Sequence, residues 1–347
     1  MKNNLKVVFF GTPVFAAPVL NELVDNGYNV VGIFAGSGPM ELKANEYGIR
    51  LFKPVSLKKE EDVFEQFKIL DPDICIVAAY GKIIPSRYLN VPKHGFVNVH
   101  PSILPKYRGP SPVQTAILNG DPALQQADAY GKTNHSLSDE TGTETGVTIM
   151  LMDDQIDHGP ILAQKIYNLQ PTICNLHASQ ELFKLGAKLL VETLPEYISG
   201  KIKPEPQDHS RATFTKIFSR IDGQINWIEP AEKIYNKIRA LNPEPGTWTT
   251  WKGKVINITT CLNSLSKNQG SSILISPPCD EKKMDEVVYP RVAAETPGTV
   301  KKIGGNIAVA TGKYYLALDL IQLEGKKKTD AKSFINGHPD FVGSILE

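Results

Sequence analysis

The sequence is poor in cysteine and contains no long apolar run. Only 4 of its 347 residues are cysteine, and none forms a C-x-x-C pair. This absence argues against a zinc knot or a disulfide scaffold and is typical of a reducing compartment. No stretch approaches the roughly 18 uninterrupted apolar residues that a membrane helix needs. The apolar run from Val7 to Phe10 is also too short for a signal-peptide core. We therefore expect a cytoplasmic protein without a membrane partner.

Several enzyme motifs are missing as well. The turn Gly11-Thr12-Pro13 lacks both the G-x-G-x-x-G pattern and the P-loop lysine, so a plain strand-to-helix turn is its simplest interpretation. No Ser or Cys lies in a G-x-S-x-G elbow, which argues against a covalent hydrolase. The histidines other than His100 show no ligand spacing with carboxylates. We therefore predict no metal site.

What is present indicates an ordinary globular chain of about two domains, with 41% hydrophobic and 22% charged residues in 347. The net charge of +1 conceals an asymmetry between the two parts of the chain. Residues 1–200 carry 17 Lys and Arg against 21 Asp and Glu, whereas residues 201–347 carry 21 against 16. The basic second part hints at an anionic partner, and chance distribution over two solvated surfaces is the alternative.

The first part of the chain alternates between strand and helix patterns. Apolar runs predict strands at 5–10, 28–34, 73–79 and 96–100, two more within 145–167, and a long helix over 175–199. This order predicts an α/β fold with a parallel sheet and a site at the carboxyl ends of its strands. A polar, proline-bearing stretch follows, then a helix over 230–241 and several short strand-like runs with glycine turns, one of them spanning 314–323. We predict domains at 1–203 and 213–347, joined by a linker at 204–212.

The stretch from Asn98 to Gly109 carries the strongest chemical signal. Asn98 and His100 are two residues apart on a predicted strand, so their side chains lie on the same face. An amide that stabilises an oxyanion beside an imidazole that moves a proton fits acyl transfer. An Asn-x-His pair taken alone is more often structural. Asp157 could relay protons to His100 through water, whereas a turn-forming role is the simpler interpretation.

Taken together, these motifs resemble a known family. The run Asn98-Val99-His100-Pro101-Ser102-Ile103-Leu104-Pro105, followed by Asp157 in Ile156-Asp157-His158-Gly159, resembles the signature of 10-formyltetrahydrofolate-dependent formyltransferases. Further matches run nearly end to end: Phe10 to Pro13, Ala79 to Gly81, Lys106 to Gly109, Gly146 to Met150, Ile238 to Pro243 and Glu324 to Lys327. The matches in the second part are similar to family members that act on methionyl initiator tRNA.

The resemblance implies a Rossmann-like formyltransferase domain followed by a β-rich, OB-like C-terminal domain. The co-substrate would be 10-formyltetrahydrofolate, and the formyl group would pass from its N10 to the α-amine of methionine on initiator tRNA. Carried over by position, Asn98 stabilises the tetrahedral oxyanion and His100 assists proton transfer. Asp157 orients His100 and a relay water. The protein is expected to be a monomer.

The same resemblance assigns the remaining site residues. Residues that contact the folate are expected to be Ser102, Ile103, Leu104 and Pro105, with Ile103 in place of the usual leucine. Residues that line the pterin pocket are expected to be Met152, Asp153, Asp154, Gln155 and Ile156. Residues that bind the acceptor substrate are expected to be Gly11, Thr12, Pro13, Phe15 and Arg108.

Two stretches depart from the family pattern. The loop expected from Phe34 to Lys43 is short and carries one basic residue, where the family usually has a longer basic loop that reaches the tRNA acceptor end. The stretch from Asp121 to Glu144 is longer than the family pattern, and we expect a surface loop there, or a lid over the substrate. Residues 262–285 are also expected to form a loop. Two alternatives stay open: a relative that acts on a nucleotide-linked amino sugar, and a catalytically silent folate- or RNA-binding module.

Overall fold

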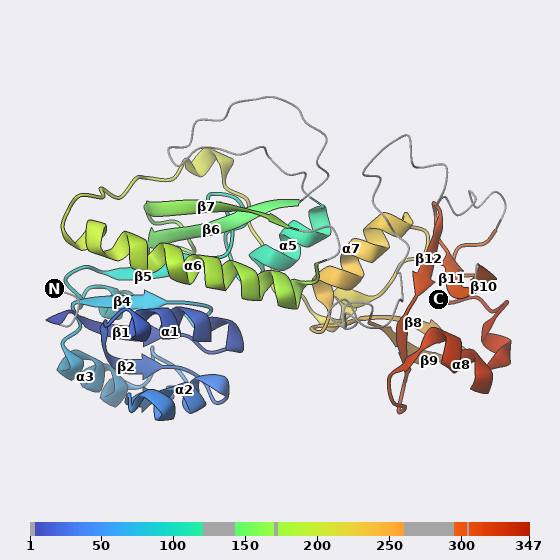
Figure 1. Ribbon diagram of the computed structural model, residues 1–347, viewed down its shortest axis with the longest axis horizontal. Helices are drawn as coiled ribbons and strands as arrows, with labels where there is room; N and C mark the ends of the chain where they lie inside the picture. The colour runs from blue at the N-terminus through green and yellow to red at the C-terminus, as the bar shows by residue number, and fades with distance from the viewer. Residues whose placement is uncertain (1–3, 121–142, 170–172, 260–294, 304) are drawn as a thin grey trace.

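The computed structural model describes residues 4–120, 143–169, 173–259, 295–303 and 305–347. The loops expected at 122–143 and 262–285 therefore lie almost entirely outside the described residues. The description begins just before β1 (Lys6–Phe10) and ends after a short helical turn, η7 (Pro339–Phe341). Figure 1 shows an N-terminal part built around a large sheet and a C-terminal part rich in short strands, with helix α7 (Ala231–Leu241) beside the junction.

The N-terminal part contains a seven-stranded sheet whose first five strands run parallel. Its order is β3 (Leu51–Phe52), β2 (Asn29–Phe34), β1, β4 (Ile74–Val77), β5 (Phe96–His100), β6 (Thr143–Leu151) and β7 (Ile161–Leu169). β6 and β7 pair antiparallel at one edge. The predicted α/β fold is confirmed, and this Rossmann-like order places loops from several strands along one carboxyl edge.

Both faces of the sheet are covered, because alternate residues of the strands enter different cores. Val7 and Phe9 pack into the core that includes buried residues of α6 (Asn175–Ile198), whereas Val8 and Phe10 pack among aromatic rings on the other face. This alternation produces the continuous apolar run of a strand buried on both sides. The helices that cover the sheet are α1 (Ala17–Asp25), α2 (Pro39–Tyr47), α3 (Glu61–Leu70), α4 (Ser86–Leu89), α5 (Pro112–Asn119) and α6, with the short turn η2 (Val14–Ala16) before α1.

The expectation of a loop from Phe34 to Lys43 is wrong for its second part. Helix α2 begins at Pro39, at the position where proline is favoured, and ends before Gly48, which adopts the left-handed conformation with a φ of 65°. Helix α2 thus forms the second part of this stretch and packs near α1.

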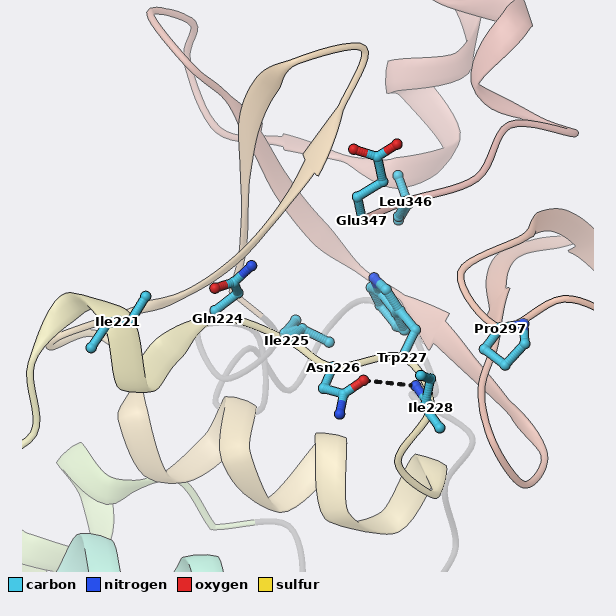
Figure 2. Close-up of a pocket in the computed structure, with 9 residues that line it drawn as sticks. All are labelled: Ile221, Gln224, Ile225, Asn226, Trp227, Ile228, Pro297, Leu346 and Glu347. Atoms are coloured by element: carbon cyan, nitrogen blue, oxygen red, sulfur yellow. Dashed lines mark hydrogen bonds between the residues drawn. The ribbon is translucent and has the colours of Figure 1, made fainter.

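The C-terminal part is β-rich, as predicted. One sheet has the order β14 (Thr329–Asp330), β13 (Leu320–Leu323), β9 (Lys254–Ile258), β8 (Thr247–Trp251), and the other has the order β10 (Val300–Ile303), β11 (Asn306–Ala310), β12 (Tyr315–Leu318). The run expected as one strand over 314–323 is two strands in different sheets, because the pairing partner changes at Asp319 from β11 to β9 and β14. Helix α8 (Ala331–Gly337) packs against the hydrophobic core of the C-terminal part, which includes Ile225, Trp227 and Leu346 of the pocket drawn in Figure 2. An OB-like barrel stays a prediction.

The segment predicted as a linker lies against the N-terminal part. Glu205 pairs with Ile161 through two backbone hydrogen bonds of 2.9 and 2.8 Å, and Gln207 is only 5% exposed. A short helical turn, η3 (His209–Arg211), follows, and a second, η4 (Arg220–Gly223), precedes α7. Helix α7 packs on α5 and α6. The domain boundaries themselves stay predictions. Within the described ranges, no helix combines the length and the apolar character that a membrane crossing requires.

Candidate active site

Asn98 and His100 lie at the carboxyl end of β5, where the parallel part of the sheet meets β6. Asn98 is opposite Met150 and His100 is opposite Thr148 in the β5–β6 pairing. Their side chains share one face of the strand because they are two residues apart. Asn98 is half-buried, and His100 is 4% exposed. The neighbouring Val97 and Val99 anchor the strand in the core below.

The hydrogen bonds of His100 identify which ring nitrogen is available for proton transfer. Nε2 lies 3.0 Å from the carbonyl oxygen of Tyr107. Because a carbonyl can only accept, Nε2 carries a hydrogen and donates it there. Nδ1 faces the Asp157 carboxylate, at 3.7 Å from Oδ1. The ring is thus held by one nitrogen while the other is left to exchange a proton.

Asp157 comes from the turn between β6 and β7. Its Oδ1 accepts from Asn98 Nδ2 at 3.3 Å, and its Oδ2 accepts from the Gly109 amide at 2.7 Å. The residue has a φ of 46°, in the left-handed region that only short polar side chains and glycine adopt readily. Gly159 lets this turn close, because a Cβ there would lie 2.0 Å from the Leu151 carbonyl oxygen. The fold therefore joins Asn98, His100 and Asp157 in one cluster.

The expected folate-contacting residues form a buried loop directly after β5. Thr148 Oγ1 donates to the Ser102 carbonyl at 2.7 Å and accepts from the Leu104 amide at 3.1 Å. Gln164 reinforces the loop by donating to the Leu104 carbonyl at 2.9 Å. Ser102 and Leu104 are buried, and Ile103 and Pro105 are half-buried. The loop is rigidly placed beside His100, and its contact with folate stays a prediction.

The expected pterin-lining residues follow β6 and precede Asp157 in the connection to β7. Asp153 accepts from His158 Nδ1 at 2.6 Å and from the Gln155 amide at 2.9 Å, as a turn-forming aspartate does. Met152 is half-buried against the aromatic core, whereas Asp154 and Gln155 are exposed and Ile156 is 68% exposed. These side chains form the outer side of the cluster, and their contact with a ligand stays a prediction.

Gly11 and Thr12 shape the turn that follows β1. A Cβ on Gly11 would lie 2.7 Å from the Ala16 Cβ and 2.8 Å from the Ala78 carbonyl oxygen, so only glycine fits. Thr12 Oγ1 donates to the Tyr80 carbonyl at 3.3 Å and accepts from the Gly36 amide at 3.2 Å. Pro13 precedes the helical turn η2. The turn ties three strand ends together, and contact with the acceptor substrate stays a prediction here and for Phe15, which stacks on Phe183.

Comparison with known proteins identifies the family. The profile of the formyl transferase family matches residues 5–194, and the profile of the formyl transferase C-terminal domain matches residues 218–339. The chain belongs to the formyl transferase family. It is 39% identical to a methionyl-tRNA formyltransferase of Roseiflexus sp. (strain RS-1), over 96% of this chain and 92% of that protein. A methionyl-tRNA formyltransferase of Synechococcus sp. (strain JA-2-3B'a(2-13)) is 36% identical over 99% and 98%.

Solved structures share the fold of this formyl transferase at low sequence identity. HypX from Aquifex aeolicus, in complex with tetrahydrofolic acid, has a TM-score of 0.60 and 14% identity, over 98% of this chain and 48% of that one. An N-formyltransferase from Helicobacter canadensis, in complex with folinic acid and dTDP-3-aminofucose, has a TM-score of 0.59 and 16% identity, over 90% and 99%. At these identities the likeness concerns the fold alone.

Arg108 of this formyl transferase is turned into the protein. Its side chain is 3% exposed and donates to Gln207 Oε1 from Nε at 3.2 Å and from Nη2 at 2.7 Å. Nη2 also donates to His209 Nδ1 at 2.8 Å. The guanidinium thus lies against the segment expected as a linker, and its contact with substrate stays a prediction. Sequence reasoning missed Gln207 and His209, because nothing in a polar stretch distinguishes a buried glutamine from a solvated one.

Burial keeps two tyrosines near the site neutral. Loss of solvation raises the pKa of Tyr88 to about 12 and also raises the pKa of Tyr80. Both side chains belong to the aromatic core on the face that Asn98 and His100 share. A phenol that stays protonated is a poor proton acceptor at neutral pH, so neither tyrosine competes with His100 as the base. In the parts of the chain that the structure describes, no three His, Cys, Asp or Glu side chains are grouped so that they could hold a metal ion.

Proposed function

We propose that this formyl transferase moves the formyl group of 10-formyltetrahydrofolate to the α-amine of methionyl initiator tRNA. The observation that carries this proposal is the convergence of Asn98, His100 and Asp157 at the carboxyl end of β5, with contacts of 3.3 and 3.7 Å among them. The full-length relatives named as methionyl-tRNA formyltransferases support the same acceptor. We further propose that the protein acts as a monomer in the cytoplasm.

The chemistry needs an oxyanion donor and a proton acceptor but no enzymic nucleophile. The uncharged α-amine attacks the formyl carbon, and the carbonyl electron pair moves onto oxygen. Asn98 Nδ2 has two hydrogens, and since one is directed to Asp157 Oδ1 the other is free to donate to that oxyanion. The attacking nitrogen passes its proton to His100 Nδ1, directly or through water. The bond from carbon to the folate N10 then breaks, and N10 takes up a proton as it leaves.

Asp157 contributes by orientation. Its carboxylate is fixed by the Gly109 amide at 2.7 Å and lies 3.7 Å from His100 Nδ1. From this place the carboxylate orients the His100 ring and a relay water. It also holds the Asn98 amide, so that the oxyanion donor and the proton acceptor keep a fixed relative position. The folate would lie between the loop of Ser102 to Pro105 and the segment of Met152 to Ile156.

A second candidate acceptor is a nucleotide-linked amino sugar. The observation that favours it is the single basic residue in the stretch from Phe34 to Lys43, where family members usually have a longer basic loop, together with helix α2, which begins within this stretch. The formyl-transfer residues would keep their roles, because an amino group on a sugar reacts with a formamide in the same way. The basic second part of the chain favours tRNA instead, since Lys and Arg bind a phosphate backbone.

The test is formyl transfer to three acceptors under one set of conditions: methionyl initiator tRNA, methionyl elongator tRNA and a thymidine-diphosphate amino sugar. We expect transfer to the initiator tRNA only, with a KM for tRNA that rises steeply between about 50 and 200 mM salt, because phosphate contacts are screened. Transfer to the sugar, with none to tRNA and little dependence on salt, would replace the first candidate by the second.

A further inference from the structure

The segment between the two parts of the chain contributes a glutamine to the active-site cluster. We propose that Gln207 is a positioning residue that holds Asp157 and the loop of Tyr107 to Gly109 in the arrangement needed for formyl transfer. The inference rests on the proposed function, since it concerns the same site. It gives a positioning role in catalysis to a segment that the sequence predicts to be a linker.

The side-chain amide of Gln207 is fully used. Nε2 donates to the backbone carbonyl of Asp157 at 2.9 Å and to that of Gly159 at 2.7 Å. Oε1 accepts two hydrogen bonds from the guanidinium of Arg108, at 3.2 and 2.7 Å. Both hydrogens and both lone pairs thus have partners, which fixes the orientation of the amide. A buried amide saturated in this way is rigid.

Gln207 therefore joins the two loops that hold the Asp157 carboxylate. One loop is the turn that contains Asp157 itself. The other contains Arg108, and its next residue, Gly109, donates to Asp157 Oδ2 at 2.7 Å. A shift of either loop moves the carboxylate relative to His100 and Asn98. The left-handed φ of 46° at Asp157 needs support of this kind, because the surrounding structure must maintain an unfavourable backbone conformation.

The same segment also fixes the loop that holds His100. Thr213 accepts from the Tyr107 amide at 2.8 Å through Oγ1 and from the Arg108 amide at 2.9 Å through its carbonyl. Thr215 donates its amide to the Arg108 carbonyl at 2.7 Å. Residues 213–215 thus lie beside the loop like an added strand. The Tyr107 carbonyl in this loop accepts from His100 Nε2 at 3.0 Å. The positions of both His100 and Asp157 accordingly depend on the segment 205–215.

The variant that isolates the proposed role is Gln207→Glu. A carboxylate keeps the acceptor for Arg108, as an ion pair, but it has no hydrogens for the carbonyls of Asp157 and Gly159. We expect kcat to fall about 10- to 100-fold, as it does when a reacting group is misplaced by about 1 Å. We expect KM for folate and tRNA to change by less than about 2-fold, because the Gln207 side chain is buried.

The matched control is Gln66→Glu. Gln66 also accepts a hydrogen bond from an arginine, Arg50 Nη2, at 2.7 Å, and it lies on α3 away from the cluster. The same chemical change there should leave kcat within about 2-fold of wild type. Binding of 10-formyltetrahydrofolate by calorimetry serves as the check that each variant is folded. If Gln207→Glu fails this check, Gln207→Ala is measured in its place with the same expectation for kcat and KM.

A double-mutant cycle with Asp157→Asn separates positioning from general stability. If Gln207 acts through Asp157, Gln207→Glu should lower kcat by less than about 2-fold once Asp157 is already Asn. A wild-type kcat in Gln207→Glu, or a full additional loss in the double variant, would overturn the inference while wild-type transfer to tRNA upholds the proposed function. Absence of transfer to tRNA by the wild-type protein would overturn both.

Discussion

Two buried asparagines show how one side chain serves different purposes in the two parts of the molecule. Asn242, after α7, is 3% exposed, and its Nδ2 donates to the carbonyls of Ile238 and Ile258 at 2.7 and 3.2 Å and to Thr247 Oγ1 at 3.0 Å. Asn98, on β5, is half-buried and has one bond, of 3.3 Å, to Asp157.

The side-chain amides of Asn98 and Asn242 differ in the hydrogen-bond partners of their hydrogens. All contacts of the Asn242 amide nitrogen are inside the fold, so neither of its hydrogens is left for a ligand, and its buried Oδ1 has no hydrogen-bond partner among the described residues. The Asn98 amide keeps a hydrogen free at the carboxyl edge of a parallel sheet, where ligands bind in such folds. Burial and hydrogen bonding of an amide therefore distinguish a structural role from a catalytic one better than its residue type does.

The largest effect is expected for His100→Ala. Removal of the proton acceptor should lower kcat by about 10²- to 10⁴-fold, the usual contribution of general acid–base catalysis. The Tyr107 carbonyl also loses its hydrogen bond from His100, so the free energy of unfolding should fall by about 1–3 kcal/mol. The measurement is a steady-state formyl transfer assay beside calorimetry. His177→Ala, at the start of α6, is the control and should keep kcat. An unchanged kcat in His100→Ala would contradict the assignment.

Thr247→Val should lower the stability of the fold and leave kcat unchanged. Thr247 is fully buried, and its Oγ1 donates to the Ile258 carbonyl at 2.7 Å and accepts from Asn242 at 3.0 Å. Valine removes both hydrogen bonds, while the Ile258 carbonyl still accepts from Asn242 at 3.2 Å, so the free energy of unfolding should fall by about 1 kcal/mol. Denaturant unfolding measures this loss, and kcat at low temperature should not change. Thr250→Val, at a half-exposed site on β8, should cost less than about 0.5 kcal/mol.

Thr148→Val should affect both stability and substrate binding. Thr148 is fully buried but holds the Ser102 and Leu104 backbone beside the active site. Loss of its hydroxyl should reduce the free energy of unfolding by about 1–2 kcal/mol and also raise KM for folate. Chemical denaturation and a folate titration give the two values. A loss of stability without any change in KM would place the loop outside the folate site.

The smallest effect is expected at Asp222, which lies outside the groups of residues around Asn98 and Asn242. A hydrogen bond from Lys216, followed by bonds from Ser219, lowers the pKa of Asp222 from 3.8 to about 2. A folded-state pKa below the ordinary value means that the ionised group stabilises the fold above about pH 4 and loses this effect as pH falls to about 2. Asp222→Asn should therefore lower the unfolding temperature slightly at pH 6, and the difference should vanish near pH 2. A difference that grows on acidification would contradict the sign.

The sequence was sufficient for the central strands and for the Asn98–His100 pair, because both depend on local periodicity. The two-residue spacing in β5 places those side chains on one face without any knowledge of the fold. Helix α2 was missed, although Pro39 and Gly48 are its usual boundary signals. The single strand expected over 314–323 proved to be two, since the apolar pattern alone cannot locate the residue at which a chain passes from one sheet to another.

The rest of the site depends on tertiary structure. Asp157 reaches Asn98 from 59 residues away, and only the antiparallel β5–β6 pairing brings it there. Residue spacing could not supply this contact, and the family resemblance was needed to propose it. Gln207 is still farther along the sequence, in a stretch whose polar composition is typical of a solvated linker. Its role becomes visible only when Arg108 and the Asp157 backbone are seen on either side of its amide.

The most direct test of the account measures kcat and unfolding free energy together for Asn98→Ala and Asn242→Ala. We predict that Asn98→Ala lowers kcat for formyl transfer about 10²- to 10³-fold, as loss of an oxyanion donor does, with nearly wild-type stability. Asn242→Ala should lose about 1–3 kcal/mol of unfolding free energy and keep its kcat at low temperature. The division of roles would be contradicted if both variants lost kcat, if both lost unfolding free energy, or if Asn98→Ala kept its kcat.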